Sequence, residues 1–190
     1  MYYLVDTNVF LHVIDSCIYG VANLCKTNDN DVCVTQTIID ELEPGYYREK
    51  EDVSSKEIHT CVTNLVYGNM GFKPIKLINL SDIEGAKEEL KQIRDRFYGW
   101  MKDPTYLQSM IDQGCLTLEE IKKSKFRKMD LGECELIAIA KVSDGKYWIV
   151  SNDRGRVYKH PEVNVFENYA KYIVLLSGDE WLKKIGKIGE

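Results

Sequence analysis

The sequence predicts an α/β protein in which helices flank a central, mainly parallel β-sheet on both faces, giving three α/β/α layers. Short apolar runs rich in β-branched and aromatic residues alternate with segments of helical periodicity, and this alternation is typical of parallel sheets. The chain has 190 residues and contains neither an internal repeat nor a linker. A chain of this length can build one ordinary core, so we expect a single domain over residues 1–190.

The N-terminal part is expected to repeat a strand–helix unit. The β-rich run of residues 2–5 comes first, and apolar side chains recur at helical spacing over residues 9–14. A second, brief β-rich run covers residues 32–34. Thr35 follows that run and can cap the next helix, which we expect to extend through Leu42.

Residues 46–128 are expected to form a helical elaboration of this one domain. A helix over residues 58–67 and a strand over residues 73–80 come first. Ser81 and Thr117 each stand three residues before a glutamate, which is the capping-box pattern of a helix N-terminus. We therefore expect a helix to begin at each of these two positions.

The last part is expected to return to the strand–helix pattern. Gly132 precedes a helix over residues 133–142, and a strand is expected at residues 147–150 with a turn directly after it. A final strand over residues 173–176 and a helix over residues 179–185 complete the predicted domain.

Charge is unevenly distributed along the chain. The formal net charge is −5, yet residues 121–160 hold ten basic and five acidic side chains and so carry +5. This asymmetry fits ordinary surface scatter and a phosphate-binding face equally well. A run of five basic residues can follow a phosphate backbone, with Phe126 available to stack on a base, or can be a solvated helix end. The run consists of Lys122, Lys123, Lys125, Arg127 and Lys128.

The sequence favours a cytoplasmic protein that does not enter a membrane. No apolar run approaches the roughly 20 residues needed to cross a bilayer. The first residues lack a basic region and reach Asp6 before an apolar signal segment can form. The six cysteines include no C-x-x-C pair, which argues against a zinc cage.

Four acidic residues fall in segments that a parallel sheet can bring together beyond the carboxyl ends of its strands. Asp6 ends the first strand, Glu41 lies in the second helix, Glu133 lies in the first turn of a later helix, and Asp153 follows the strand after it. Each has an ordinary alternative as a turn, cap or exposed helix residue. Together they predict a metal site, because clustered carboxylates repel one another unless a hard cation lies between them.

Four segments resemble, in order, the motifs of PIN-domain nucleases. Leu4–Phe10 is similar to the first motif, a strand running into D-[ST]-N, and Val34–Leu42 resembles the second, an apolar stretch ending in Glu-Leu. Leu131–Ala140 is similar to the third motif in the branch that reads L-G-x-x-E-x-I-A-x-A. Ile149–Arg156 resembles the fourth, an apolar strand that closes on a [ST]-x-D or D-D-R-x-G-R turn, here with Ser151 and Asp153 in the [ST]-x-D positions. Four such matches in this order are more specific than any one of them, and they imply a PIN-like fold.

The resemblance also implies a role for each matching residue. An acidic site for Mg²⁺ or Mn²⁺ would be formed by Asp6, Glu41, Glu133 and Asp153. Hydrogen bonds from Asn8 or Asn152 would support it. Glu135 stands two residues after Glu133 on the same expected helix and points elsewhere, so one of these two glutamates should serve the metal.

Arg154 and Arg156 are the better candidates to hold a phosphate, because the turn after the strand at residues 147–150 fixes them beside Asp153. The implied activity is that of an endoribonuclease, a phosphodiesterase that uses a metal-activated water to cut RNA and needs no side-chain nucleophile. Two alternatives remain. A haloacid-dehalogenase-like phosphatase would use Asp6 as its nucleophile, but it wants a second Asp where this chain has Asn8. A catalytically silent PIN-type domain would bind RNA or protein.

The sequence leaves several partners of such a nuclease open. A toxin-type nuclease would need an inhibitory protein partner, which one sequence cannot reveal. Homo-oligomer formation and the choice between RNA and DNA are open in the same way.

Overall fold

The computed structural model describes residues 1–16, 31–44, 46, 53–68 and 75–185, and its centre is a five-stranded sheet. The strands run in the order β3-β2-β1-β4-β7, and every neighbouring pair is parallel. Their bounds are β1 Tyr2–Val5, β2 Asp31–Val34, β3 Lys76–Leu77, β4 Tyr147–Val150 and β7 Leu175–Leu176. The predicted α/β class and parallel central sheet are therefore confirmed.

The central strands β1 and β4 end at the same level of the sheet. Val5 pairs with Val150, and the next amide, that of Asp6, donates to the Val150 carbonyl oxygen at 2.9 Å. The last two residues of each of these strands are fully buried. The backbone after β1 is thus held against the end of β4, and this fixes the position from which the Asp6 side chain projects.

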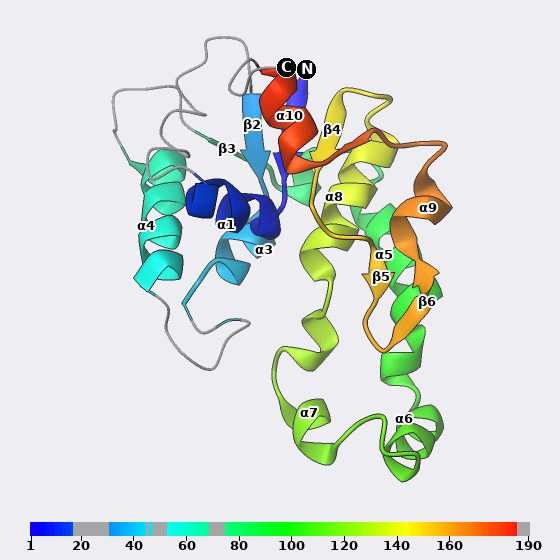
Figure 1. Ribbon diagram of the computed structural model, residues 1–190. Helices are drawn as coiled ribbons and strands as arrows, with labels where there is room; N and C mark the ends of the chain where they lie inside the picture. Colours follow the sequence, from blue (N-terminus) through cyan, green and yellow to red (C-terminus); the bar gives the residue numbers. More distant parts are fainter. Residues whose placement is uncertain (17–30, 45, 47–52, 69–74, 186–190) are drawn as a thin grey trace.

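Helices pack around the sheet (Figure 1). Helix α1 contacts α3, α4 and α10, and α8 contacts α3, α5 and α9 as well as β4, so α3 lies against both α1 and α8. The α-helices are α1 Thr7–Ser16, α3 Gln36–Glu41, α4 Val53–Tyr67, α5 Ala86–Tyr98, α6 Pro104–Asp112, α7 Leu118–Lys122, α8 Leu131–Val142, α9 Val165–Tyr169 and α10 Gly178–Lys184. Short 3₁₀ turns lie at η1 Leu80–Asp82, η2 Gly99–Lys102 and η3 Phe126–Lys128.

Helix α8 is buried along most of its length. Every residue from Gly132 to Ala140 is buried, including Glu133 and Glu135. A helix that is apolar on nearly all sides is stable only inside a core, and α8 meets this condition by packing between α5 and α3. Its two glutamates are therefore carried into the interior with the helix.

The capping predictions have mixed outcomes. Thr35 caps α3 by accepting from the Ile38 amide, and Thr117 forms a full capping box with Glu120, so both are confirmed. The helix expected from Ser81 to about Met101 is present, but its predicted start is wrong. Ser81 lies in the η1 turn, and α5 begins only after Gly85, whose φ of 79° breaks the helical path.

The segment from residue 46 to residue 128 contains more than added helices. Within its described part, β3 joins the central sheet and α5 packs against α8, whereas α6 and α7 lie away from the sheet at the bottom of Figure 1. The stretch after β4 adds an antiparallel hairpin that the sequence did not reveal, formed by β5 Arg156–Val157 and β6 His160–Asn164 and followed by α9.

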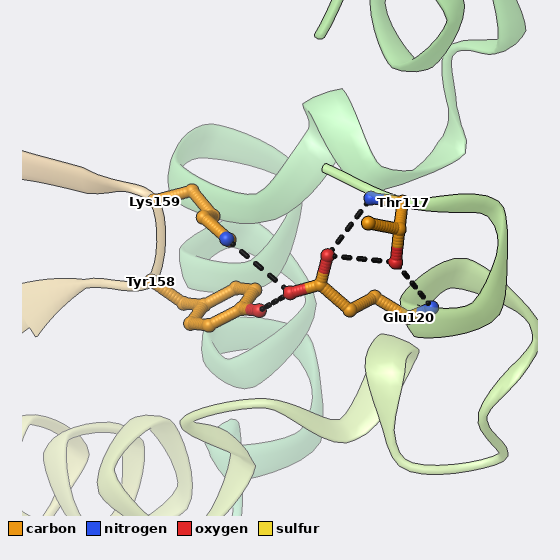
Figure 2. A network of polar contacts seen from close by, with 4 residues as sticks. All are labelled: Thr117, Glu120, Tyr158 and Lys159. Carbon is orange, nitrogen blue, oxygen red and sulfur yellow. Dashed lines mark hydrogen bonds and ion pairs between the residues drawn. The ribbon is translucent and has the colours of Figure 1, made fainter. Parts of the chain in front are cut away.

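A polar network joins α7 to the hairpin turn (Figure 2). Glu120 accepts a hydrogen bond from the Tyr158 hydroxyl at 3.2 Å and pairs with the Lys159 ammonium at 3.3 Å. The helical part that lies farthest from the sheet is thereby tied to the segment that follows β4. None of the helices in the described parts of the chain is both long and apolar enough to cross a membrane.

Candidate functional site

A pocket of about 270 Å³ opens beyond the carboxyl ends of β1 and β4, and acidic side chains dominate its lining. Five carboxylates line it, those of Asp6, Glu41, Asp130, Glu133 and Asp153. They come from the ends of β1 and β4, from α3, and from the start of α8. All four acids expected from the sequence are thus brought to one place, and Asp130 joins them. We call this the acidic pocket.

Asp6 is held rigidly by three donors. Its Oδ1 accepts from the Thr7 amide at 2.7 Å, and its Oδ2 accepts from Asn8 Nδ2 at 2.8 Å and Ser151 Oγ at 2.7 Å. Burial nevertheless raises the pKa of Asp6 to about 6, and the nearby charge of Asp153 adds to that rise. The donors fix the orientation of the carboxylate without supplying a compensating positive charge.

Glu41 lies close to the second residue of α8, Gly132. Glu41 accepts from Thr7 Oγ1 at 2.9 Å and from the Gly132 amide at 3.3 Å. A Cβ at position 132 would stand 2.9 Å from Glu41 Oε2 and 2.8 Å from Ile38 Cδ1, both closer than side chains tolerate. The Leu-Gly pair of the third motif therefore has a steric reason: a larger residue at position 132 would displace the side chains of Ile38 and Glu41 from their present positions.

Glu133 and Glu135 differ in what they face. Glu133 lines the acidic pocket, its Oε1 is buried, and no hydrogen-bond partner of that atom lies among the described residues. Burial raises its pKa well above the usual value, and the surrounding carboxylates raise it further. Glu135 instead accepts from Thr37 Oγ1 at 2.8 Å and does not line the pocket. The geometry thus assigns Glu133 to the pocket and Glu135 to the contact between α8 and α3.

Asp130 is the acid that the sequence analysis missed. It stands before α8 with a φ of 55°, and its Oδ2 accepts from the Tyr98 hydroxyl at 2.9 Å and the Tyr158 amide at 3.0 Å. Burial raises its pKa. In the sequence it stands just after the basic run and just before the third motif. Asp130 is held at the pocket by hydrogen bonds to residues 28 and 32 positions away, and no local sequence pattern indicates such contacts.

The turn after β4 positions Asp153 by its own backbone. Asp153 Oδ1 accepts from the Arg154 amide at 2.6 Å, and the Asp153 amide donates to Ser151 Oγ at 3.0 Å. Ser151 in turn bonds Asp6, so one hydroxyl links the ends of the two central strands. No role in the site was expected for this serine from the sequence, although it occupies the first position of the serine-x-aspartate turn in the fourth motif.

The two asparagines expected to support the site have different tasks. Asn8 donates to Asp6 through Nδ2 and accepts from the Asn152 amide through Oδ1 at 2.8 Å, so it braces the pocket directly. The side chain of Asn152 turns away, and its Oδ1 accepts from the Gly178 amide at the start of α10 at 2.8 Å. Only the backbone of Asn152 takes part in the bracing.

The donor set of the acidic pocket fits a hard divalent cation. All five charged lining groups are carboxylates, and no lysine or arginine is found among the described residues that line it. Oxygen ligands of this kind suit Mg²⁺ or Mn²⁺. Glu133 Oε1 is a buried oxygen of the pocket that has no hydrogen-bond partner among the described residues. As placed, no three His, Cys, Asp or Glu side chains within the described ranges form a ready-made metal-binding group.

The basic candidates divide into two sets. Arg154 and Arg156 line a second pocket of about 540 Å³, which shares Asp153 with the acidic pocket. The five residues of the basic run, all of them described, line neither pocket. Lys125 lies over the Tyr46 ring. The expectation that Phe126 can stack on a base is wrong, because Phe126 is only 3% exposed and packs edge-on against Trp100.

No family model matches the chain, and no curated protein matches it significantly.

Proposed function

We propose that this protein is a divalent-metal-dependent nuclease of PIN-like type, and specifically an endoribonuclease. The observation that carries the proposal is the acidic pocket: five carboxylates from separate segments converge beyond the ends of the central strands, with arginines in the adjoining pocket. A negative pocket beside cationic side chains suits a metal that acts on a phosphate group. The parallel five-stranded sheet with helices packed around it supports the proposed three-layer PIN-like architecture.

The residues of this chain have distinct roles in the proposal. Asp6, Glu133 and Asp153 would hold the cation, with Glu41 and Asp130 completing the negative lining. When bound, Mg²⁺ or Mn²⁺ supplies an activated water and neutralises negative charge on the leaving oxygen. Asn8 and Ser151 keep Asp6 in one orientation, and the Gly132 amide does the same for Glu41. Arg154 and Arg156 bind the phosphates of the RNA strand.

The geometry around Asp6 disfavours the phosphatase alternative. A covalent mechanism at Asp6 wants a second carboxylic acid two residues later to protonate the leaving group. That position holds Asn8, whose Nδ2 donates to Asp6 and whose Oδ1 accepts from the Asn152 amide. Both ends of this amide are engaged, and an amide is not a proton donor to a leaving group.

The proposal is tested by cleavage assays on labelled single-stranded and structured RNA, with DNA of the same sequence beside them. We expect cleavage of RNA with Mg²⁺ or Mn²⁺ and none with EDTA, and a loss of most activity in Asp6→Asn. Crystals soaked in Mn²⁺ should show anomalous density among the acids of the pocket. Cleavage that persists unchanged in EDTA contradicts the metal mechanism; Mn²⁺ density without cleavage of any RNA favours the catalytically silent domain.

A further inference from the structure

The second pocket, which we call the arginine pocket, lies directly beside the acidic pocket. Its lining comes from the turn after β4, from the β5–β6 hairpin, from α9 and from β7. Asp153 lines both pockets, so whatever occupies one adjoins the other. Its volume of about 540 Å³ falls within the roughly 300–1,000 Å³ of pockets that take small organic ligands.

The lining of the arginine pocket combines two kinds of surface. Arg154 and Arg156 supply cations, and both side chains are exposed. Ile173 and Leu175 supply an accessible apolar surface, whereas Phe166 is only 4% exposed and lies beneath it. A ligand that satisfies both must carry an anionic group and a flat or apolar group a short distance apart. A nucleotide has this composition, because a phosphate suits the guanidinium groups and the face of a base suits an apolar surface.

The cationic and apolar parts of the lining form one rigid unit. Gly155 stands between the two arginines with a φ of 66°, and its carbonyl oxygen accepts from the Val165 amide at 2.7 Å. A Cβ at Gly155 would stand 2.5 Å from Phe166 Cδ2 and 2.8 Å from Asn164 Oδ1. The turn that carries the arginines therefore rests directly on the residues that begin α9, and glycine is needed for that approach.

We propose that the arginine pocket binds one nucleotide of the RNA strand next to the phosphate being cut, with its phosphate on Arg154 and Arg156 and its base against Ile173 and Leu175. The assignment to an RNA strand rests on the proposed function. The pocket would then make cleavage depend on the base at that position, because the apolar surface meets the base and not the backbone. Glu167, whose side chain is exposed beside the pocket, adds a hydrogen-bond acceptor that favours bases with an exocyclic amino group.

The test measures nucleotide binding without cleavage. Wild-type protein in EDTA is titrated with adenosine 5′-monophosphate, with inorganic phosphate and with adenosine, and binding is followed by calorimetry and by amide chemical shifts. We expect the nucleotide to bind on the order of tenfold more tightly than either part alone, with shifts at Gly155 and Phe166. Phosphate that binds as tightly as the nucleotide would overturn the proposal, because the arginines alone would then explain the site.

Two variants and a matched control locate the binding. Ala170 lines the pocket and is exposed, so Ala170→Trp fills the space without opening the core; Lys171→Trp places the same side chain at the next position, outside the lining. We expect Ala170→Trp to reduce nucleotide binding at least tenfold and Lys171→Trp to leave it unchanged. Leu175→Ser removes apolar surface from an exposed position of the lining and should lose the preference for nucleotide over phosphate. Wild-type affinity in both pocket variants contradicts the proposal.

The same proteins separate this proposal from the proposed function. Nucleotide binding in EDTA with no RNA cleavage under any metal condition would refute the nuclease and keep the pocket. RNA cleavage with the same base preference in wild type and Ala170→Trp would keep the nuclease and refute the pocket.

Discussion

Glu120 and Glu133 both lie in the first turn of a helix, where the helix dipole favours a negative charge, yet their surroundings are opposite. Glu120 accepts from the Thr117 amide and hydroxyl, from Tyr158 and from Lys159 (Figure 2). These contacts lower its pKa, the Thr117 amide most of all. Glu133 is buried among other carboxylates, and its pKa is raised well above the usual value.

The difference separates an acid that stabilises the fold from an acid that the fold must tolerate. The contacts of Glu120 join α7 to the hairpin turn, and its charge is compensated where it stands. Glu133 is desolvated and lies near other carboxylates. Among the described residues, no hydrogen-bond donor contacts its Oε1 to compensate for this. In the proposed function, a bound divalent cation compensates the charge of these carboxylates.

The largest expected effect is on cleavage. Glu133→Gln should lower RNA cleavage by about a hundredfold or more, equivalent to about 2.7 kcal/mol of transition-state stabilisation. Glu135→Gln is the matched control on the same helix and should have a much smaller effect, because Glu135 faces Thr37 and not the acidic pocket. Single-turnover rates with Mn²⁺ provide the comparison. Equal losses in the two variants would show that the pocket does not distinguish these glutamates.

The next effect concerns the arginines. Replacing Arg154 and Arg156 together by Ala should weaken RNA binding and reduce the slope of log affinity against log salt by about 1.4, since each lost single-strand phosphate contact removes about 0.7. Replacement of Lys87 and Lys91, two exposed lysines on α5 that line neither pocket, removes the same charge. An identical change of slope in that control would mean that only net charge matters.

The charge state of Asp6 affects the stability of the metal-free protein. A pKa raised from 3.8 to about 6 means that the metal-free fold binds the Asp6 proton more tightly than the unfolded chain does. Its stabilising contribution is complete below about pH 4 and is lost as the pH rises through about 6. Asp6→Asn should therefore raise the stability of the metal-free protein at pH 8 by on the order of 1 kcal/mol, and this gain should vanish near pH 4.

Thermal unfolding in EDTA and in Mn²⁺ checks this prediction. The variant should lose most of the stabilisation that Mn²⁺ gives wild type, because a ligand stabilises a fold in proportion to its occupancy of the native state. If Asp6 were only a cap at the start of α1, asparagine would replace it with little effect. An unchanged Mn²⁺ shift together with wild-type cleavage would remove Asp6 from the site.

The smallest effect is expected at Glu120. Glu120→Ala should lower stability by about 1 kcal/mol through the lost capping box, with or without metal, and should leave cleavage within about twofold. Because its pKa is lowered, its contribution is present above about pH 4.5 and is lost as the pH falls, the reverse of Asp6. Urea unfolding at pH 4 and pH 8 measures this sign. A loss of cleavage with unchanged stability would place Glu120 in the catalytic machinery.

Helices and strands with local sequence signals could be predicted from the amino-acid sequence. Apolar runs marked β1, β2 and β4, and the side chains of Thr35 and Thr117 marked two helix starts, because a cap is made within a few residues. Ser81 shows the limit of this reasoning. It has the capping pattern, but Gly85 delays the helix, and the chain forms a 3₁₀ turn first.

Which side chains share a surface depends on how distant segments pack together. Asp130 joins the acidic pocket through Tyr98 and Tyr158, and Glu133 rather than Glu135 faces it because α8 lies between α3 and α5. The arginine pocket is lined by residues from the β4 turn, α9 and β7. No local sequence pattern indicates that these three segments meet. Hydrogen bonding and burial between distant segments depend on how helices pack on the sheet, and packing is a property of the whole core rather than of any short stretch of sequence.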